Sequence, residues 1–317
     1  MSQASVRIHR SRGVAGVTLS SGGLEATFVP ELNMLGTSLR LEGEEYLALP
    51  GGVTAYRSRH ATGLPLLAPW ANRLSERSYR SAGVSADLRE ADLSTDPNGL
   101  PIHGTMWGET WQIESLSARG RAARLRATFD YGREDLLTAF PFPHRIVAVI
   151  GVDGRSLSVS TSISRIDDRA VPVSFGFHPY LRLPRGRPSS WRLLLPEREH
   201  LELDDRSIPT GRRVREAAER ERIGSRTFDD LYALGDVREL GIEGGDRRLS
   251  IGFDDGYPYA QAYAPPDETF VCLEPMTAPT DALVKGDCVS VQPGETYTAR
   301  FTIRPERTTY PRSEAIS

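Results

Sequence analysis

The sequence predicts an all-β protein, a sandwich or barrel built from many short strands. Apolar and polar residues alternate in segments of five to eight residues, such as 124–129, 145–150 and 157–163. Glycine, proline and Asp-Gly turn signals separate these segments at regular spacing. No segment keeps a helical period beyond about three turns, which argues against helical and mixed architectures.

The length and composition are those of a folded protein with a large core. The chain has 317 residues, of which 39% are hydrophobic and 26% are charged. Length alone suggests about two domains, but large β-sandwiches form a single one. We therefore expect one domain over residues 14–305, between a flexible N-terminal lead-in at 1–13 and a loose C-terminal tail at 306–317.

The charge balance indicates no nucleic-acid or membrane partner. The formal net charge is −3, which gives no electrostatic footprint for either. No apolar run is long enough to span a membrane, and the polar segment 1–13 is not followed by the apolar run of a signal peptide. We expect a cytoplasmic protein that is a monomer or a homodimer.

The reactive residue types exclude some chemistries. Cys272 and Cys288 stand sixteen residues apart without a partner Cys or His motif, which disfavours a zinc site. Two buried thiols are the expectation, with a disulfide as the alternative. The single lysine, Lys285, lies in a turn-like Val-Lys-Gly-Asp segment, which disfavours Schiff-base chemistry.

In chain order, most segments are interpreted as strands. Residues 14–46 have the pattern of a β-meander with a break at Pro30. Residues 112–170 predict further strands, with a hairpin at Asp153-Gly154 and one helical turn at 134–140. Within the polar stretch 204–226, Ile208 to Gly211 predict a turn, and the charges of alternating sign after it are expected to form a solvated loop or a short helix.

An extended loop is predicted at residues 63–74. Two prolines within five residues exclude a central strand or a helix interior, and the apolar content is typical of a loop that lines a site. The loop ends in Asn72 and Arg73, whose hydrogen-bond donors could bind ligand hydroxyls. The alternative for Arg73 is a surface side chain with a packed stem.

A second loop is predicted at residues 97–111. His103 stands beside Gly104, which supplies backbone freedom. Trp107 and Trp111 could stack on the apolar face of a sugar, or pack beneath the loop, which we favour for at least one of them.

Two acid–base residues share the same local setting. His178 and Glu274 each end an apolar strand and directly precede a proline, which favours extended backbone and ends regular pairing. An imidazole titrates near pH 7, so a rigidly mounted His178 suits a general acid or base. The alternative is a structural histidine that caps a strand.

Together these motifs resemble the aldose 1-epimerase (mutarotase) family. The resemblance covers about 14–302 and rests on motifs that occur in the family's order: Gly63 to Leu74, Ile102-His103-Gly104, Gly176 to Tyr180, Ile208 to Gly211 ahead of Phe228 to Tyr232, and Leu273-Glu274-Pro275. It implies a large antiparallel β-supersandwich with one carbohydrate cleft, without a metal or another cofactor, and a small-molecule aldose as partner.

The resemblance also implies roles for individual residues. His178 is expected to be the general acid and Glu274 the general base. Substrate binding is expected from Asn72, Arg73, His103, Tyr180 and Asp229. Asp230 is the alternative to Asp229, which we prefer because of its spacing to the aromatic Tyr232.

The chemistry needs one acid and one base. Interconverting α and β anomers of an aldohexose removes a proton from the C1 hydroxyl and delivers one to the ring oxygen. The ring opens, the C1–C2 bond rotates, and closure on the other face reverses both transfers. We expect Glu274 as a carboxylate and His178 as an imidazolium, with Asp229 raising the pKa of His178.

Other functions are compatible with parts of the pattern. A hexose-6-phosphate mutarotase would need clustered cations near the cleft, and a non-catalytic carbohydrate-binding module would not need both His178 and Glu274. A metal-dependent enzyme could use His103, His178, Asp229 and Glu274 as ligands, although their spacing is not compact. Glycoside hydrolysis by paired carboxylates is disfavoured, because the strongest motif centres on a histidine.

Overall fold

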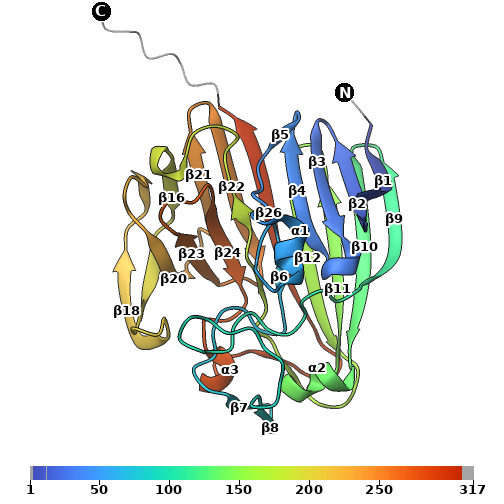
Figure 1. Cartoon of the computed structure of the whole chain (residues 1–317), viewed down its shortest axis with the longest axis vertical. Coiled ribbons are helices and arrows are strands. Elements are labelled where there is room, and N and C mark those ends of the chain that lie inside the picture. The colour runs from blue at the N-terminus through green and yellow to red at the C-terminus, as the bar shows by residue number, and fades with distance from the viewer. Residues whose placement is uncertain (1–2, 12, 309–317) are drawn as a thin grey trace, which may run out of the picture.

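The computed structural model describes residues 3–11 and 13–308, and these are dominated by antiparallel strands. The prediction of an all-β sandwich is confirmed. Three large sheets carry the fold, and every pairing between named strands is antiparallel. Figure 1 shows the first five strands at one side of the molecule and β16 to β24 at the other.

The largest sheet has nine strands. In spatial order they are β19 (Glu219–Arg222), β16 (Arg192–Leu195), β21 (Glu239–Gly244), β22 (Arg247–Asp255), β26 (Thr296–Arg307), β12 (Leu157–Arg165), β11 (His144–Val152), β10 (Ala122–Tyr131) and β9 (Gln112–Arg119). The Asp153-Gly154 turn joins β11 to β12, as the sequence predicts, with Val152 opposite Leu157.

Two smaller sheets face this large one. The five-stranded sheet runs β1 (Ser5–Ser11), β2 (Val14–Ser21), β3 (Leu24–Val29), β4 (Leu35–Leu41) and β5 (Glu44–Glu45). The eight-stranded sheet runs β18 (Pro209–Glu216), β17 (Arg198–Leu203), β20 (Phe228–Leu234), β23 (Tyr259–Ala264), β24 (Val271–Met276), β14 (Gly176–Phe177) and β6 (Leu66–Leu67), and β15 (Tyr180–Leu181) pairs with β24.

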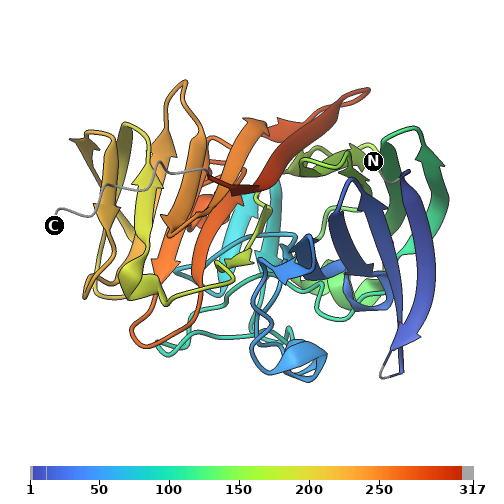
Figure 2. The ribbon, with the colours of Figure 1, turned by 90° about the horizontal axis from the view of Figure 1, so that it is seen from above.

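The core lies between the nine-stranded sheet and the two smaller sheets. One apolar cluster joins Leu19 of β2, Leu125 of β10, Ile251 of β22 and Leu273 of β24, all of them 0% exposed. Each fully buried side chain of this kind contributes roughly 1.5–3 kcal/mol. The view from above shows the five-stranded sheet beside the green strands of the nine-stranded one (Figure 2). This packing leaves the outer face of the eight-stranded sheet free to carry a site.

The remaining elements are short. They are α1 (Gly52–Arg57), α2 (Glu134–Ala139), α3 (Ala282–Lys285), the 3₁₀ turns Pro30–Leu32 and Pro188–Ser190, and two pairs of strands, β7 (Ser78–Ser81) with β8 (Val84–Asp87) and β13 (Val171–Pro172) with β25 (Ser290–Val291). The predicted helical turn at 134–140 is α2. Within the described part of the chain, none of the helices has the length and apolarity needed to cross a membrane.

The structure corrects two sequence predictions. Residues 5–11, expected within a flexible lead-in, form β1 and pair with β2 along their whole length. The charge run after Gly211, expected to be a solvated loop or short helix, lies largely in β18 and β19, and β18 already begins within the predicted turn, at Pro209. Strand β18 is an exposed edge whose arginines pair with carboxylates of β17, such as Arg213 with Glu199 at 3.1 Å.

The C-terminal boundary and the state of the two cysteines also differ in part from the sequence predictions. Strand β26 ends at Arg307, so the first two residues of the predicted tail at 306–317 belong to a strand, and 309–317 lie outside the described residues. Cys272 and Cys288 are free thiols, the first fully buried and the second partly buried. The disulfide alternative is therefore wrong.

Candidate active site

The loop 63–74 holds two distant parts of the chain together. On one side it pairs with the segment that carries the candidate acid, because the amide of His178 donates to the carbonyl of Pro65 at 3.2 Å and the amide of Ala71 donates to Ser174 at 2.7 Å. On the other side the amide of His103 donates to the carbonyl of Asn72 at 3.0 Å. The extended loop predicted from its prolines therefore brings both histidines to one place.

Gly104 makes the second of these contacts possible. Its φ is +70°, and a Cβ at this position would lie 2.1 Å from the carbonyl oxygen of Ala68. That oxygen accepts the amide of Thr105 at 3.0 Å. Only a glycine fits so close to the backbone of loop 63–74, and His103 itself adopts a positive φ of 63° beside it.

Strand register supplies the groups on the opposite wall. Gln261 of β23 lies directly across from Glu274 of β24. Because side chains alternate along a strand, Ala260, Ala262 and Leu273 point into the core, and Gln261 and Glu274 point outward. Asp229 of β20 joins the same face, since it pairs with Tyr263.

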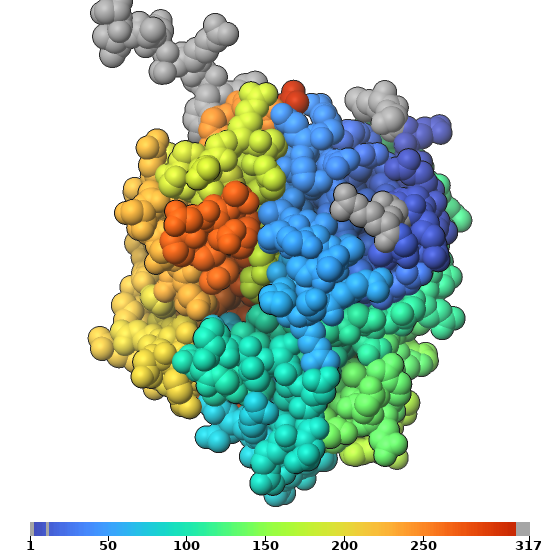
Figure 3. All heavy atoms as spheres, in the orientation of Figure 1, coloured from blue at the N-terminus to red at the C-terminus, as the bar shows by residue number. Residues whose placement is uncertain are grey.

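These elements enclose a cavity of about 390 Å³. Its lining includes all seven residues predicted for the site, namely Asn72, Arg73, His103, His178, Tyr180, Asp229 and Glu274, together with Arg59, His60, Ala61, Thr95, Asp96, Pro97, Ile102, Gln261 and Tyr263. The lining comes from segments far apart in the sequence, and on the face seen in Figure 3 blue, teal and orange parts of the chain lie against one another.

A larger groove of about 480 Å³ lies elsewhere, over the outer face of the five-stranded sheet. It is lined by polar side chains such as His9, Thr18 and Thr27, which hydrogen-bond to one another. None of the predicted site residues lines it. Volume alone therefore does not locate the chemistry, and the smaller cavity is the candidate active site.

His178 and Glu274 face each other inside the smaller cavity. Nε2 of His178 lies 3.3 Å from Oε1 of Glu274, although 96 positions separate the two in the sequence. Both side chains are buried, at 9% and 2% exposure. Nδ1 of His178 and Oε2 of Glu274 have no hydrogen-bond partner. Buried polar atoms are usually satisfied, so two unpaired atoms on facing side chains are exceptions of the kind found at functional sites.

The electrostatics of the pair differ from the sequence prediction. Burial, and to a lesser extent the charge of Arg73, lower the pKa of His178 to about 3, so the expectation that Asp229 would raise it is wrong. Burial raises the pKa of Glu274 well above its ordinary value, and Asp229 adds to this rise. Both shifts favour the uncharged forms, a neutral imidazole on His178 and a protonated carboxyl on Glu274.

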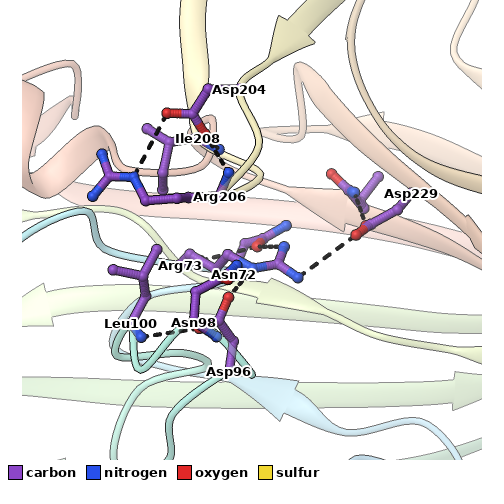
Figure 4. Close-up of polar contacts among 10 residues, drawn as sticks. Asn72, Arg73, Asp96, Asn98, Leu100, Asp204, Arg206, Ile208 and Asp229 are labelled. Carbon is purple, nitrogen blue, oxygen red and sulfur yellow. Dashed lines mark hydrogen bonds and ion pairs between the residues drawn. The ribbon is translucent and has the colours of Figure 1, made fainter.

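Arg73 is held by three neighbours rather than extended into solvent (Figure 4). Its Nε donates to Oδ2 of Asp96 at 2.8 Å, and its Nη1 donates to Oδ1 of Asn72 at 3.0 Å. Its Nη2 lies 3.6 Å from Oδ2 of Asp229. The alternative of a surface arginine is wrong, because only 15% of the side chain is exposed.

The two adjacent aspartates separate onto opposite faces of β20. Asp229 lines the cavity and accepts a hydrogen bond from Nε2 of Gln261 at 2.6 Å. Asp230 points between the sheets, where its Oδ1 lies 3.3 Å from Nε2 of His200. Of the two candidates for ligand binding, only Asp229 faces the cavity.

Aromatic rings support the histidine. The ring of Tyr180 is stacked on that of His178, with centroids 4.8 Å apart and planes 17° apart. The ring of His103 meets His178 edge-on at 5.5 Å. Neither Trp107 nor Trp111 lines the cavity: the first packs on Tyr56 and the second is 3% exposed. Packing, not sugar stacking, describes both tryptophans.

The polar residues of the cavity that were not predicted from the sequence include Gln261 and Asp96. Gln261 is 1% exposed, and its Oε1 has no partner. The sequence around Gln261 indicates only an alternating strand. Its position opposite Glu274 depends on the register between β23 and β24, which the sequence does not specify. Asp96 lies in Asp-Pro-Asn-Gly, which indicates a turn and nothing more. Among the described residues, no group of three or more His, Cys, Asp or Glu is arranged to hold a metal ion.

Comparisons with known proteins identify the family and similar folds. A family model described as aldose 1-epimerase matches residues 37–304. No curated protein sequence matches the chain. Among solved structures, a galactose mutarotase-like protein from Clostridium acetobutylicum has a TM-score of 0.86 at 18% identity, covering 96% of this chain and 99% of its own. Galactose 1-epimerase from Lactobacillus acidophilus has a TM-score of 0.79 at 15% identity, covering 97% and 100%.

Proposed function

The chain belongs to the aldose 1-epimerase family, and from that premise we propose that it interconverts the α and β anomers of a neutral aldohexose. The observation that carries this proposal is the facing of His178 and Glu274 at 3.3 Å inside a cavity. The two groups are close enough to serve the C1 hydroxyl and the ring oxygen of one pyranose, whose oxygens share the anomeric carbon.

The proposed cycle begins when the proton of the pair moves from Glu274 to His178 across this short separation. His178 then donates to the ring oxygen while Glu274 takes the proton of the C1 hydroxyl, and the bond between C1 and the ring oxygen breaks. The open-chain aldehyde faces a protonated Glu274 and a neutral His178. Burial favours these two uncharged forms.

Ring closure reverses both transfers. The C1–C2 bond rotates, the hydroxyl that was the ring oxygen attacks the other face of the aldehyde, and its proton returns to His178. Glu274 gives its proton to the new C1 hydroxyl. One proton is conserved through the cycle, and each acid–base group contributes roughly 10²–10⁴-fold. We propose that no metal takes part, so activity should persist in the presence of EDTA.

The charges of the lining favour a neutral sugar over a sugar phosphate. Two arginines line the cavity, and both are already paired: Arg73 with Asp96 and Asp229, and Arg59 with Asp92. A phosphate would have to displace these carboxylates. The hexose-6-phosphate alternative therefore has no specific support from the cavity.

A non-catalytic binding module is also disfavoured. Burial lowers the pKa of His178 and raises the pKa of Glu274, so the charged form of each side chain is disfavoured. Burying such groups costs folding stability. A module that only binds hydroxyls gains nothing from that arrangement. A reaction that moves one proton between two oxygens uses it directly.

Polarimetry on freshly dissolved sugars tests the proposal. We expect the chain to accelerate the mutarotation of at least one of α-D-glucose, α-D-galactose and related aldoses over buffer, with or without EDTA. Hexose 6-phosphates should be poorer substrates. No acceleration with any free aldose would reject the function proposed here.

A further inference from the structure

We propose that Asp96 is the positioning residue for Arg73, fixing the plane of its guanidinium so that the remaining N–H groups face the sugar. This inference rests on the proposed function for its kinetic consequence, but its geometry stands independently. Asp96 touches Arg73 and its own loop, and it is a residue that neither the sequence motifs nor the family resemblance indicated.

The carboxylate of Asp96 uses both of its oxygens. Oδ1 accepts the amides of Asn98 and Leu100, each at 2.9 Å, and these bonds fix the loop and the rotamer of Asp96. Oδ2 accepts Nε of Arg73 at 2.8 Å. The side chain is only 1% exposed, so water cannot take the place of Arg73 at this oxygen.

Burial by itself raises the pKa of Asp96, but the amide of Leu100, the guanidinium of Arg73 and the amide of Asn98 outweigh it. The net result is a lowered pKa, so Asp96 remains a carboxylate at neutral pH. It can therefore provide Arg73 with a permanent, charge-assisted acceptor.

Two fixed acceptors, Asp96 and Asn72, define the orientation of Arg73. A guanidinium is planar, so bonds from Nε to Asp96 and from Nη1 to Asn72 set its plane. The Nη2 edge is left toward the cavity, where Asp229 lies 3.6 Å away. Without Asp96, Nε would be unpaired, and Arg73 could rotate about its side-chain bonds.

The chain contains a matched control for this loop. Asp204 caps its own turn in the same way, since its Oδ1 accepts the amides of Arg206 and Ile208, each at 2.9 Å. Figure 4 shows both turns. Oδ2 of Asp204 lies 3.8 Å from Nε of Arg206, a residue of its own turn. Asp204 therefore shares the capping function of Asp96 without its contact to Arg73.

The test compares Asp96→Asn with Asp204→Asn. In either variant the amide oxygen can still accept both loop N–H groups, but at position 96 the amide nitrogen would face another donor, Nε of Arg73. We expect Asp96→Asn to lower kcat/KM about 10²-fold, the order that misplacement by about 1 Å can cost. Asp204→Asn should stay near the wild-type value.

A double-mutant cycle separates positioning from a structural effect. If Asp96 acts through Arg73, then Asp96→Asn should cause less than about a twofold further loss in the Arg73→Ala background. An equal loss in both backgrounds, or wild-type activity of Asp96→Asn, would overturn the inference.

NMR of the full chain gives a readout without turnover. In ¹⁵N-labelled protein the Arg73 Nε–H signal, assigned by its absence from Arg73→Lys, should be protected from solvent exchange. That protection should disappear in Asp96→Asn and persist in Asp204→Asn. Protection that survives Asp96→Asn contradicts the positioning role. If the NMR result holds while the wild type turns over no aldose, the proposed function fails and the positioning contact stands.

Discussion

Glu274→Gln removes the proposed base and leaves its shape in place. Glutamine fills the same volume, so the strand β24 and the contact with Gln261 should survive. The amide cannot take a proton from the C1 hydroxyl at neutral pH. At 2% exposure, no bulk water is present to act as a substitute base.

The expected loss follows from these facts. A positioned general base contributes roughly 10²–10⁴-fold, which corresponds to about 3–5 kcal/mol in the activation barrier. Since the site excludes water, we expect a loss in the upper half of this range. The KM should change little, because the amide oxygen can still accept a hydrogen bond from the sugar.

The variant should also be more stable than the wild type at high pH. The pKa of Glu274 is raised in the folded protein, so the folded state binds more protons than the unfolded state above the ordinary pKa of 4.5. Stability from this group is present below that pH and is lost as pH rises through the folded pKa. Glutamine does not titrate and avoids this loss.

Polarimetry and thermal unfolding at pH 5 and pH 8 check both expectations on the same preparation. We expect a large loss of kcat together with a gain in Tm that is greater at pH 8. A kcat within threefold of the wild type would refute the role of Glu274 as the base. A Tm difference that does not depend on pH would refute the account of its burial.

Three further predictions test the surrounding structure. Asp229→Asn should raise KM about tenfold or more through loss of a charge-assisted hydrogen bond, while Asp230→Asn, on the other face of β20, should leave kinetics unchanged; similar effects would contradict the assignment of faces. Gly104→Ala should lower the free energy of unfolding, measured in urea, by more than Gly108→Ala does. Both glycines have a positive φ, which costs an alanine about 1–2 kcal/mol, but only at Gly104 would the added Cβ clash with backbone atoms. His178 has a pKa lowered from 6.5 to about 3, so the unfolded state binds more protons between these values, and wild-type Tm should fall more steeply than that of His178→Asn as pH drops through this window; parallel curves would count against a buried neutral imidazole.

The sequence predicts much of the fold because apolar alternation follows burial. In β11 the buried residues Ile146, Ala148 and Ile150 alternate with residues that are more exposed, as the two-residue period of a strand requires. The prediction fails for β18, where nearly every residue is exposed. An edge strand held by cross-strand ion pairs has no apolar period, so it cannot be told from a loop by pattern.

The site is predictable where its signals are local. His178 and Glu274 are indicated by strand ends before prolines, and the 63–74 loop by its own prolines. Gln261 becomes part of the site only through its pairing with Glu274, and Asp96 only through its contact with Arg73. The direction of the pKa shift of His178 depends on burial, which no local pattern specifies, so that prediction was wrong.

Exchange NMR on an equilibrated aldose in D₂O tests the central claim most directly. The account predicts exchange cross-peaks between the α and β anomeric protons with the wild-type chain, while the protons on C1 and C2 are retained. Glu274→Gln should abolish the cross-peaks. Cross-peaks of wild-type strength with that variant would contradict the role of Glu274 as the base, and loss of the C2 proton to solvent would show that a different reaction takes place.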